Sequence, residues 1–283
     1  MATERRAVLC GSCRQLISNR EKRCPHCGAL RPDSFGLGGK LWAFFRDDVD
    51  PTMLLIGLCG LIYVLAIVRN PAAALDTSNL LSIGSPSCDA MALLGITSGP
   101  RMWAGHGWTL LTAGVLHLSL LHIAFNMYFL RSFGAKAHGL LGPARTLVLF
   151  FLSSIGGFLV SDLLSGAPTA GASAGLFGLL GGMAVFGYRR GGTLGAALKR
   201  EMLMTAGMVT LYSLFMGGVN HWAHGGGMAA GALIALGFPK HEGRHEGRGV
   251  QLLAVALTLA TVTAVFFNVW HTLQGSRLSQ MCG

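Results

Sequence analysis

Charged residues are scarce in this sequence. Asp, Glu, Lys and Arg make up 12% of its 283 residues, whereas a typical globular protein has about 25%. Acidic residues are the scarcer sign, with 12 against 22 Lys and Arg. The first ten residues, MATERRAVLC, contain no apolar run, so we expect no cleavable signal peptide. With a hydrophobic share of 52%, this scarcity of charge excludes an ordinary soluble protein and indicates burial in a lipid bilayer.

Apolar segments of membrane-spanning length follow one another from about residue 52. A helix needs roughly 20 apolar residues to cross a bilayer. The 41 glycines fit helices that pack closely in lipid. We therefore expect an all-α polytopic membrane protein with seven spans, at about residues 52–68, 110–130, 142–164, 173–188, 202–219, 221–238 and 250–272.

Lys and Arg are distributed unevenly over the predicted loops. If the N-terminus is cytoplasmic and seven spans alternate, only Arg69, Arg101 and Arg277 of the 22 Lys and Arg lie outside. Because cytoplasmic loops carry the excess of Lys and Arg, we expect a cytoplasmic N-terminus and an external C-terminus, in a bacterial inner membrane. The same distribution accounts for the net charge of +10. We therefore expect the lipid bilayer, and no nucleic acid, as a partner.

Four cysteines near the N-terminus form two CxxC pairs, CGSC and CPHC. Four thiolates satisfy the tetrahedral coordination of zinc, and a site with four protein ligands is structural. The alternative is two disulfides or free thiols, which a reducing cytoplasm disfavours. We read His26 as an exposed spacer, and we expect structural zinc bound by Cys10, Cys13, Cys24 and Cys27.

The chain is expected to have three regions. Residues 1–40 are a zinc-ribbon-like cytoplasmic module and its linker, which could bind a cytoplasmic protein. Residues 41–240 are a core with six spans, and residues 241–283 are a cytoplasmic loop, a seventh span and an external tail. The external loop at residues 70–107 is long and partly apolar, so it is either a functional element at the membrane interface or a plain connection.

Polar residues occur at three places in the predicted membrane part. Such residues are costly in lipid and are usually functional. The second span contains VLHLSLLHIAFNMYF, the fourth begins with TAGASAGLFGLLGG, and the sixth contains VNHWAHGGGMAAG. His122 and Asn126 are four residues apart, so they share a helix face. The other candidate residues in these stretches are His117, Ser173 and His224.

Ser173 and His224 both lie among small residues, which would let their helices approach closely. A serine hydroxyl becomes a good nucleophile when a neighbouring base removes its proton, and histidine has a suitable pKa. His122 and Asn126 could donate hydrogen bonds to an oxyanion. Two alternatives remain: a serine in a glycine-rich helix is usually a packing residue, and an intramembrane histidine can belong to an ion or proton path.

The clusters HxxxxHxxxN, GxSx and AHxGG with GxxxG, in this order, resemble the rhomboid family of intramembrane serine proteases. The resemblance covers about residues 51–240. It implies a six-helix bundle to which a seventh C-terminal transmembrane helix is added. It also implies a Ser–His dyad without an acid, and transmembrane protein substrates. The roles it implies are nucleophile for Ser173, general base for His224, and oxyanion or substrate binding for His122, Asn126, His117 and Gly171.

The sequence departs from the family pattern at a few positions. Thr109 follows Trp108 where the family usually has Arg, which puts the anchoring of the external loop in doubt. Ala174 and Phe177 stand where Gly and Tyr are common, and neither change removes a reacting group. The alternative function is a catalytically inactive rhomboid-like protein that binds membrane clients.

Two further cysteines are predicted to lie outside the membrane. Cys88 is in the long external loop and Cys282 is in the C-terminal tail. An external compartment permits disulfides, so the two could pair. The alternatives are two free thiols or a partner in another chain.

Overall fold

The computed structural model describes residues 7–10, 13, 15–18, 21, 23–28, 50–75, 82–215, 218–240 and 246–274. The chain divides into two compact units, Met1–Asp50 and Pro51–Gly283. The predicted linker at residues 32–40 lies outside the described residues.

The first unit contains a two-stranded antiparallel hairpin. Strand β1 (Ala7–Leu9) pairs with β2 (Leu16–Ser18), with Ala7 opposite Ser18 and Leu9 opposite Leu16. Its small core contains Cys10, Ile17 and Cys24, with Cys13 packed against them. Three of the four residues of this core are therefore predicted metal ligands, as is usual for a module too small to bury an apolar core of its own.

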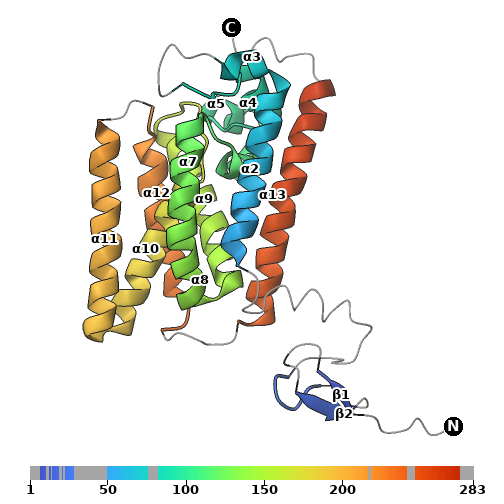
Figure 1. Cartoon of the computed structure of the whole chain (residues 1–283), viewed down its shortest axis with the longest axis vertical. Coiled ribbons are helices and arrows are strands. Elements are labelled where there is room, and N and C mark those ends of the chain that lie inside the picture. Colours follow the sequence, from blue (N-terminus) through green and yellow to red (C-terminus); the bar gives the residue numbers. More distant parts are fainter. Residues whose placement is uncertain are drawn as a thin grey trace, which may run out of the picture. The chain divides into compact units, whose positions relative to one another are not determined.

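The second unit is a bundle of helices (Figure 1). Its long helices run side by side, and α7 continues through a π-helical turn, η2, into α8. In chain order they are α2 (Pro51–Arg69), α7 (Leu120–Phe129), η2 (Leu130–Gly134), α8 (Ala135–Leu141), α9 (Pro143–Leu164), α10 (Ser173–Arg190), α11 (Gly192–Leu214), α12 (His221–Leu236) and α13 (Arg248–Gln274).

Three of these helices, α2, α9 and α13, are long and apolar enough to cross a membrane individually. The bent pair Thr109–Val115 and Leu120–Leu141 passes the same test together. The chain is thus an integral membrane protein, and the predicted all-α bundle is confirmed.

Two predicted spans have wrong bounds. The second was expected at 110–130, but Thr109–Val115 is a separate helical segment bent by 88° from Leu120–Leu141. The break occurs because Leu116 is extended and the Ser119 hydroxyl accepts from the His122 N–H, which starts a new helix. The fifth span was expected at 202–219, but α11 begins at Gly192. Lys199 and Arg200 therefore lie inside α11 and not in a loop. The membrane tolerates them there because long basic side chains can extend from a helix end towards the interface.

The long segment between α2 and α7 is folded wherever the structure describes it. Its described residues form four short helices and a 3-10 turn, and Figure 1 shows α3, α4 and α5 gathered at one end of the bundle. The Ser87 and Ser98 hydroxyls cap two of the helices by accepting backbone N–H groups. The elements are α3 (Pro71–Ala74), α4 (Cys88–Leu94), α5 (Gly99–Trp103), α6 (Thr109–Thr112) and η1 (Ala113–Val115).

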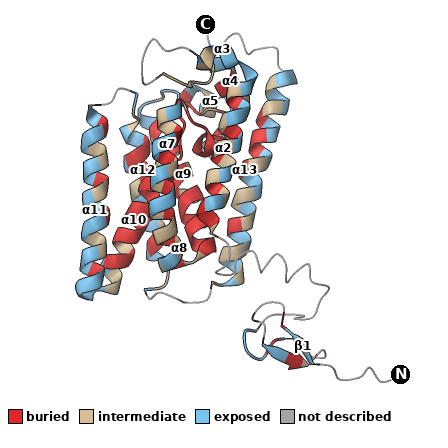
Figure 2. Ribbon diagram, in the orientation of Figure 1, coloured by how far each residue is buried: buried red, intermediate tan, exposed pale blue. Residues whose placement is uncertain are grey.

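The core lies around α9, α10 and α12, whose buried residues are concentrated in the middle of the bundle (Figure 2). The backbones of α10 and α12 touch directly. A Cβ added at Gly227 would overlap the carbonyl oxygen of Ala174, and one added at Gly231 would overlap that of Gly178. Glycine is thus needed at both positions for the close approach of the two helices.

Candidate active site

Ser173 is the first residue of α10, and the backbone just before it has a conformation that favours glycine. Gly171 has φ +139, and its N–H donates to the Ala113 carbonyl at 2.9 Å. A Cβ at this position would lie 2.8 Å from His122 Nε2. Gly171 therefore lets the chain turn into α10 while the His122 ring packs against its backbone.

His224 is positioned by the start of α12. The Asn220 side chain caps the helix by accepting from the Ala223 N–H at 3.1 Å, and its Nδ2 donates to Ser161 Oγ of α9 at 2.6 Å. His224 therefore occupies the first turn of a helix whose end is held against α9. Its ring stacks on Phe177 with centroids 4.3 Å apart and planes at 12°.

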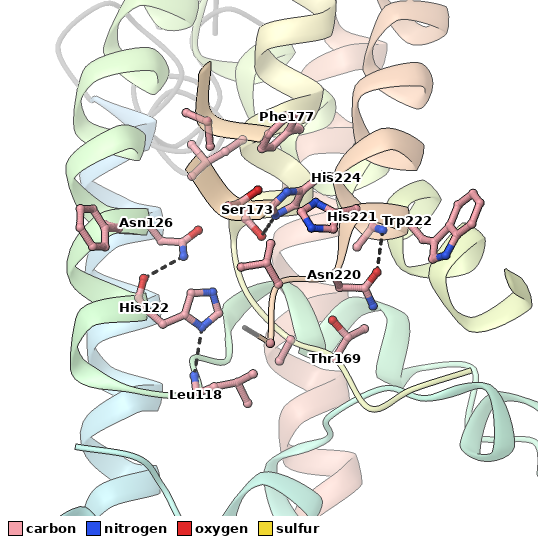
Figure 3. A pocket seen from close by; sticks show the side chains of 18 of the residues that line it. Leu118, His122, Asn126, Thr169, Ser173, Phe177, Asn220, His221, Trp222 and His224 are labelled. Atoms are coloured by element: carbon pink, nitrogen blue, oxygen red, sulfur yellow. Dashed lines mark hydrogen bonds between the residues drawn. The ribbon is translucent and has the colours of Figure 1, made fainter. Parts of the chain in front are cut away.

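The two predicted reacting groups come together. His224 Nε2 lies 2.9 Å from Ser173 Oγ, which is hydrogen-bond distance (Figure 3). The His224 side chain is 8% exposed, and its Nδ1 is buried without a hydrogen-bond partner among the described residues. An imidazole that is stacked on one face and bonded through Nε2 can accept a proton from the serine hydroxyl.

His122 and Asn126 come from α7, on the other side of the cavity from His224 (Figure 3). The Leu118 N–H donates to His122 Nδ1 at 3.2 Å. A neutral imidazole that accepts at Nδ1 carries its proton on Nε2, so the Nε2–H is directed towards Gly171 and the start of α10. Asn126 Nδ2 donates to the His122 carbonyl at 2.8 Å, which leaves its second N–H available.

His117 is placed behind the site and not in the cavity. It is 1% exposed, and its ring centroid is 5.2 Å from that of His122. Neither ring nitrogen has a hydrogen-bond partner among the described residues. Of the predicted residues, Ser173, His224, His122 and Asn126 line the cavity, whereas His117 and Gly171 support it from outside.

The cavity has a volume of about 990 Å³ and lies between α7, α10, α11 and α12. Its walls are mainly apolar, and Ser173 and His224 are among the polar residues that line it. Phe125 and Phe129 contribute from α7, and Met208 and Tyr212 contribute from α11. A long apolar chain with one reactive polar bond fits such a cavity.

Two positioning contacts escaped the sequence analysis. The stacking of Phe177 on His224 was treated only as a departure from the family pattern, and the cap by Asn220 was not noticed. An Asn directly before a helical stretch is a recognisable N-cap signal. Thr109, a further departure from the family pattern, donates its hydroxyl to the His106 carbonyl at 2.8 Å, so it is built into the external segment.

The four N-terminal cysteines converge. Their sulfur atoms all lie within 4.8 Å of one another, with Cys10 and Cys27 at 3.8 Å and Cys13 and Cys24 at 3.5 Å. None of the four forms a disulfide, which rules out the alternative of two disulfides in this structure. Four thiols gathered around one point are a donor set that can hold a metal ion.

Cys88 is disulfide-bonded. The five other cysteines that the structure describes, Cys59 among them, form no disulfide. The predicted partner, Cys282, lies outside the described residues.

Known proteins similar to this chain are rhomboid proteins. The family model of the rhomboid domain matches residues 104–241. The chain is 26% identical over 191 residues to "Rhomboid protease GluP" of Bacillus subtilis, which covers 67% of this chain and 37% of that protein. It is 31% identical over 159 residues to "Rhomboid-like protease 3" of Toxoplasma gondii, which covers 55% of this chain and 60% of that protein.

A third relative carries a different description. "Inactive RHOMBOID-like protein 8" of Arabidopsis thaliana is 33% identical over 100 residues, which is 35% of this chain and 28% of that protein. The chain spans less than two thirds of the length of each of these relatives. The match nevertheless contains Ser173 and His224 together with His117, His122, Asn126 and Gly171, so this part of the chain is similar to the rhomboid domain.

Proposed function

We propose that this chain is an intramembrane serine endopeptidase that cleaves transmembrane segments of other membrane proteins. The observation that carries the proposal is the 2.9 Å contact between Ser173 Oγ and His224 Nε2 inside a helix bundle. The relatives that are named rhomboid proteases support the same class of reaction.

In the proposed mechanism, His224 Nε2 takes the Ser173 proton as Oγ attacks the carbonyl carbon of the scissile peptide bond. The carbonyl oxygen becomes an oxyanion. It is stabilised by the Nε2–H of His122, the free N–H of Asn126 Nδ2 and the backbone N–H of Ser173. The Ser173 N–H is suited to this because the first N–H groups of a helix have no acceptor within it. His224 then returns the proton to the leaving amine, and water hydrolyses the acyl-enzyme.

The nearest candidate acids do not complete a triad. Asp162 Oδ2 accepts from Thr97 Oγ1 at 2.6 Å, and Glu201 forms an ion pair with Lys136. His224 Nδ1 has no partner among the described residues, so stacking on Phe177 and the helix cap must orient the ring. The proposal is therefore a dyad.

The cavity suggests how a substrate binds. Its apolar walls between α7 and α11 would receive the side chains of an unwound transmembrane segment, which enters laterally from the bilayer. Burial of the polar site keeps its charge interactions strong. The proposed partners are accordingly transmembrane protein substrates in the bilayer.

We further propose that the N-terminus is cytoplasmic and the C-terminus external, in a bacterial inner membrane. This rests on the positions of Lys and Arg. A reporter fused after Gly283 should behave as external, and a cytoplasmic reporter would contradict the seven-span topology.

The N-terminal module is proposed to hold structural zinc through Cys10, Cys13, Cys24 and Cys27. Bound zinc would cross-link the two cysteine pairs and stabilise the hairpin. Residues 1–40 would then form the cytoplasmic module and linker, residues 41–240 the catalytic core, and residues 241–283 the remaining loop, span and tail. The module would be available to a cytoplasmic protein partner.

The second candidate function is binding of membrane clients without cleavage. It is favoured by the relative that is named inactive. A fluorophosphonate, which reacts only with an activated serine, separates the two. Labelling of purified protein at Ser173, absent in Ser173→Ala, supports the protease, and no labelling of the folded wild type supports the client binder.

A further inference from the structure

A buried asparagine near the end of α13 forms a four-way hydrogen-bonded junction. Asn268 is 0% exposed, and its Nδ2 donates to the carbonyls of Ala92 at 3.0 Å and Leu93 at 2.8 Å. Its Oδ1 accepts from Arg101 Nη2 at 3.2 Å and Trp108 Nε1 at 2.9 Å. Both N–H groups and both lone pairs of the amide are therefore used.

The partners of Asn268 come from three separate parts of the external segment. Ala92 and Leu93 are in α4, Arg101 is in α5, and Trp108 precedes α6. Phe267 and His271 of α13 add edge contacts to the Trp108 ring, with centroids 4.8 and 5.5 Å apart. One helix turn of α13 thus joins three pieces of chain, of which α4 and α5 are also linked directly, because Arg101 Nη1 donates to the Ala92 carbonyl at 3.3 Å.

The external segment is in turn paired with the chain that leads to Ser173. Thr97 and Thr169 exchange backbone hydrogen bonds of 2.9 and 3.3 Å, and the Gly99 N–H donates to the Gly166 carbonyl at 3.2 Å. Gly171 and Ser173 follow Thr169 directly. Hydrogen bonds therefore lead from Asn268 through α4 and α5 to the segment in front of the serine.

We propose that Asn268 is a positioning residue for the serine site. By holding α4, α5 and Trp108 to α13, it fixes Thr97 and hence residues 166–172, which set the position of the Ser173 hydroxyl. This gives α13, the predicted seventh span, a part in the reaction, although none of its residues lines the cavity. The inference rests on the proposed protease function for its catalytic consequence, but the coupling between the segments can be measured without any activity.

The test compares Asn268→Ala with Thr261→Ala in the full-length protein. Thr261 is the matched control because it is also fully buried in α13, and its hydroxyl bonds to Leu257 of the same helix at 2.9 Å. Hydrogen–deuterium exchange is followed in peptides covering residues 95–103 and 166–172. Labelling of Ser173 by a fluorophosphonate is timed on the same samples.

Asn268→Ala should speed amide exchange in both peptides by roughly tenfold and slow Ser173 labelling by about the same factor. Thr261→Ala should change neither. Trp108→Phe removes one donor to Asn268 and keeps the ring contacts, so it should act in the same direction with a smaller effect. If Asn268→Ala does not fold, Trp108→Phe replaces it as the test variant.

Unchanged exchange at residues 166–172 in both Asn268→Ala and Trp108→Phe would overturn the coupling. Faster exchange with an unchanged labelling rate would overturn the positioning role. A folded wild type that is not labelled at all would refute the proposed protease, and with it the positioning role, whereas the exchange data would still decide whether the segments are coupled.

Discussion

At the scale of single residues, the site depends on groups that do not react. His224 is held by a cap from Asn220 and by the ring of Phe177. Ser173 is placed by a glycine with φ +139. These contacts explain how a serine and a histidine on different helices reach hydrogen-bond distance without an acid to orient the base.

Gly171→Ala should abolish most cleavage. A side chain at φ +139 costs roughly 1–3 kcal/mol, and the new Cβ would push against the His122 ring. The control is Gly105→Ala, where φ is +92 and a Cβ would meet nothing within 4 Å. Turnover and thermal unfolding are measured for both variants. Equal effects of the two on turnover would show that strain alone, and not the contact with His122, is responsible.

Removal of one oxyanion donor should slow the reaction without stopping it. His122→Ala or Asn126→Ala should each lower kcat by about 10²–10³, as observed for single donors in such sites. The expected loss is smaller than that from Ser173→Ala, and KM should change little. A variant of either residue with wild-type kcat would exclude that side chain from transition-state stabilisation.

Sequence reasoning singled out Ser173, His224, His122 and Asn126 because each lies in a short pattern with its own chemical meaning, and the roles given to them stay predictions. It could not find the junction at Asn268, since that side chain meets Ala92 and Trp108 from the opposite end of the chain. An isolated Asn in an apolar helix indicates a buried partner, but no local pattern identifies which partner.

At the scale of helices, the decisive feature is the contact between α10 and α12. Glycines allow the two backbones to touch, which brings the first turn of α12 to the first turn of α10. Sequence patterns predicted this close packing, but two helix bounds were wrong. The apolar run from Thr109 to Leu130 hides the break at Leu116, and the charges at Lys199 and Arg200 hide the early start of α11.

Gly231→Ala should separate the two helices. Its new Cβ would overlap the Gly178 carbonyl oxygen, and relief of such overpacking typically costs about 1–3 kcal/mol. Gly225→Ala in the same helix is the control, because a Cβ there meets nothing within 4 Å. The expected result is lower thermal stability and slower Ser173 labelling for Gly231→Ala alone. If both variants match the wild type, the glycine contact does not determine the position of His224.

At the scale of the whole molecule, the two units have separate tasks in this account. The helix bundle contains the candidate serine site, whereas the described residues of the N-terminal unit contain a candidate metal site and none of the groups that line the cavity. Since a structural metal site stabilises only its own module, the two properties should be separable.

Purified protein should contain about one zinc ion per chain. Cys24→Ser should lose the metal, and Cys59→Ser should retain it, because Cys59 is a buried free cysteine of α2. Elemental analysis of protein prepared without chelators measures both. Deletion of residues 1–40 should leave cleavage in detergent intact. Full zinc content in Cys24→Ser would contradict the four-thiolate site.

The central claim is that Ser173 and His224 act together to cleave membrane proteins. Its most direct test is incubation of the purified protein in lipid with a panel of single-span membrane proteins, beside Ser173→Ala and His224→Ala variants of equal thermal stability. The account predicts cleavage within or next to a transmembrane segment by the wild type and a similar loss in the two variants, because residues that act as a unit are lost together. Cleavage by Ser173→Ala at the wild-type rate would contradict it.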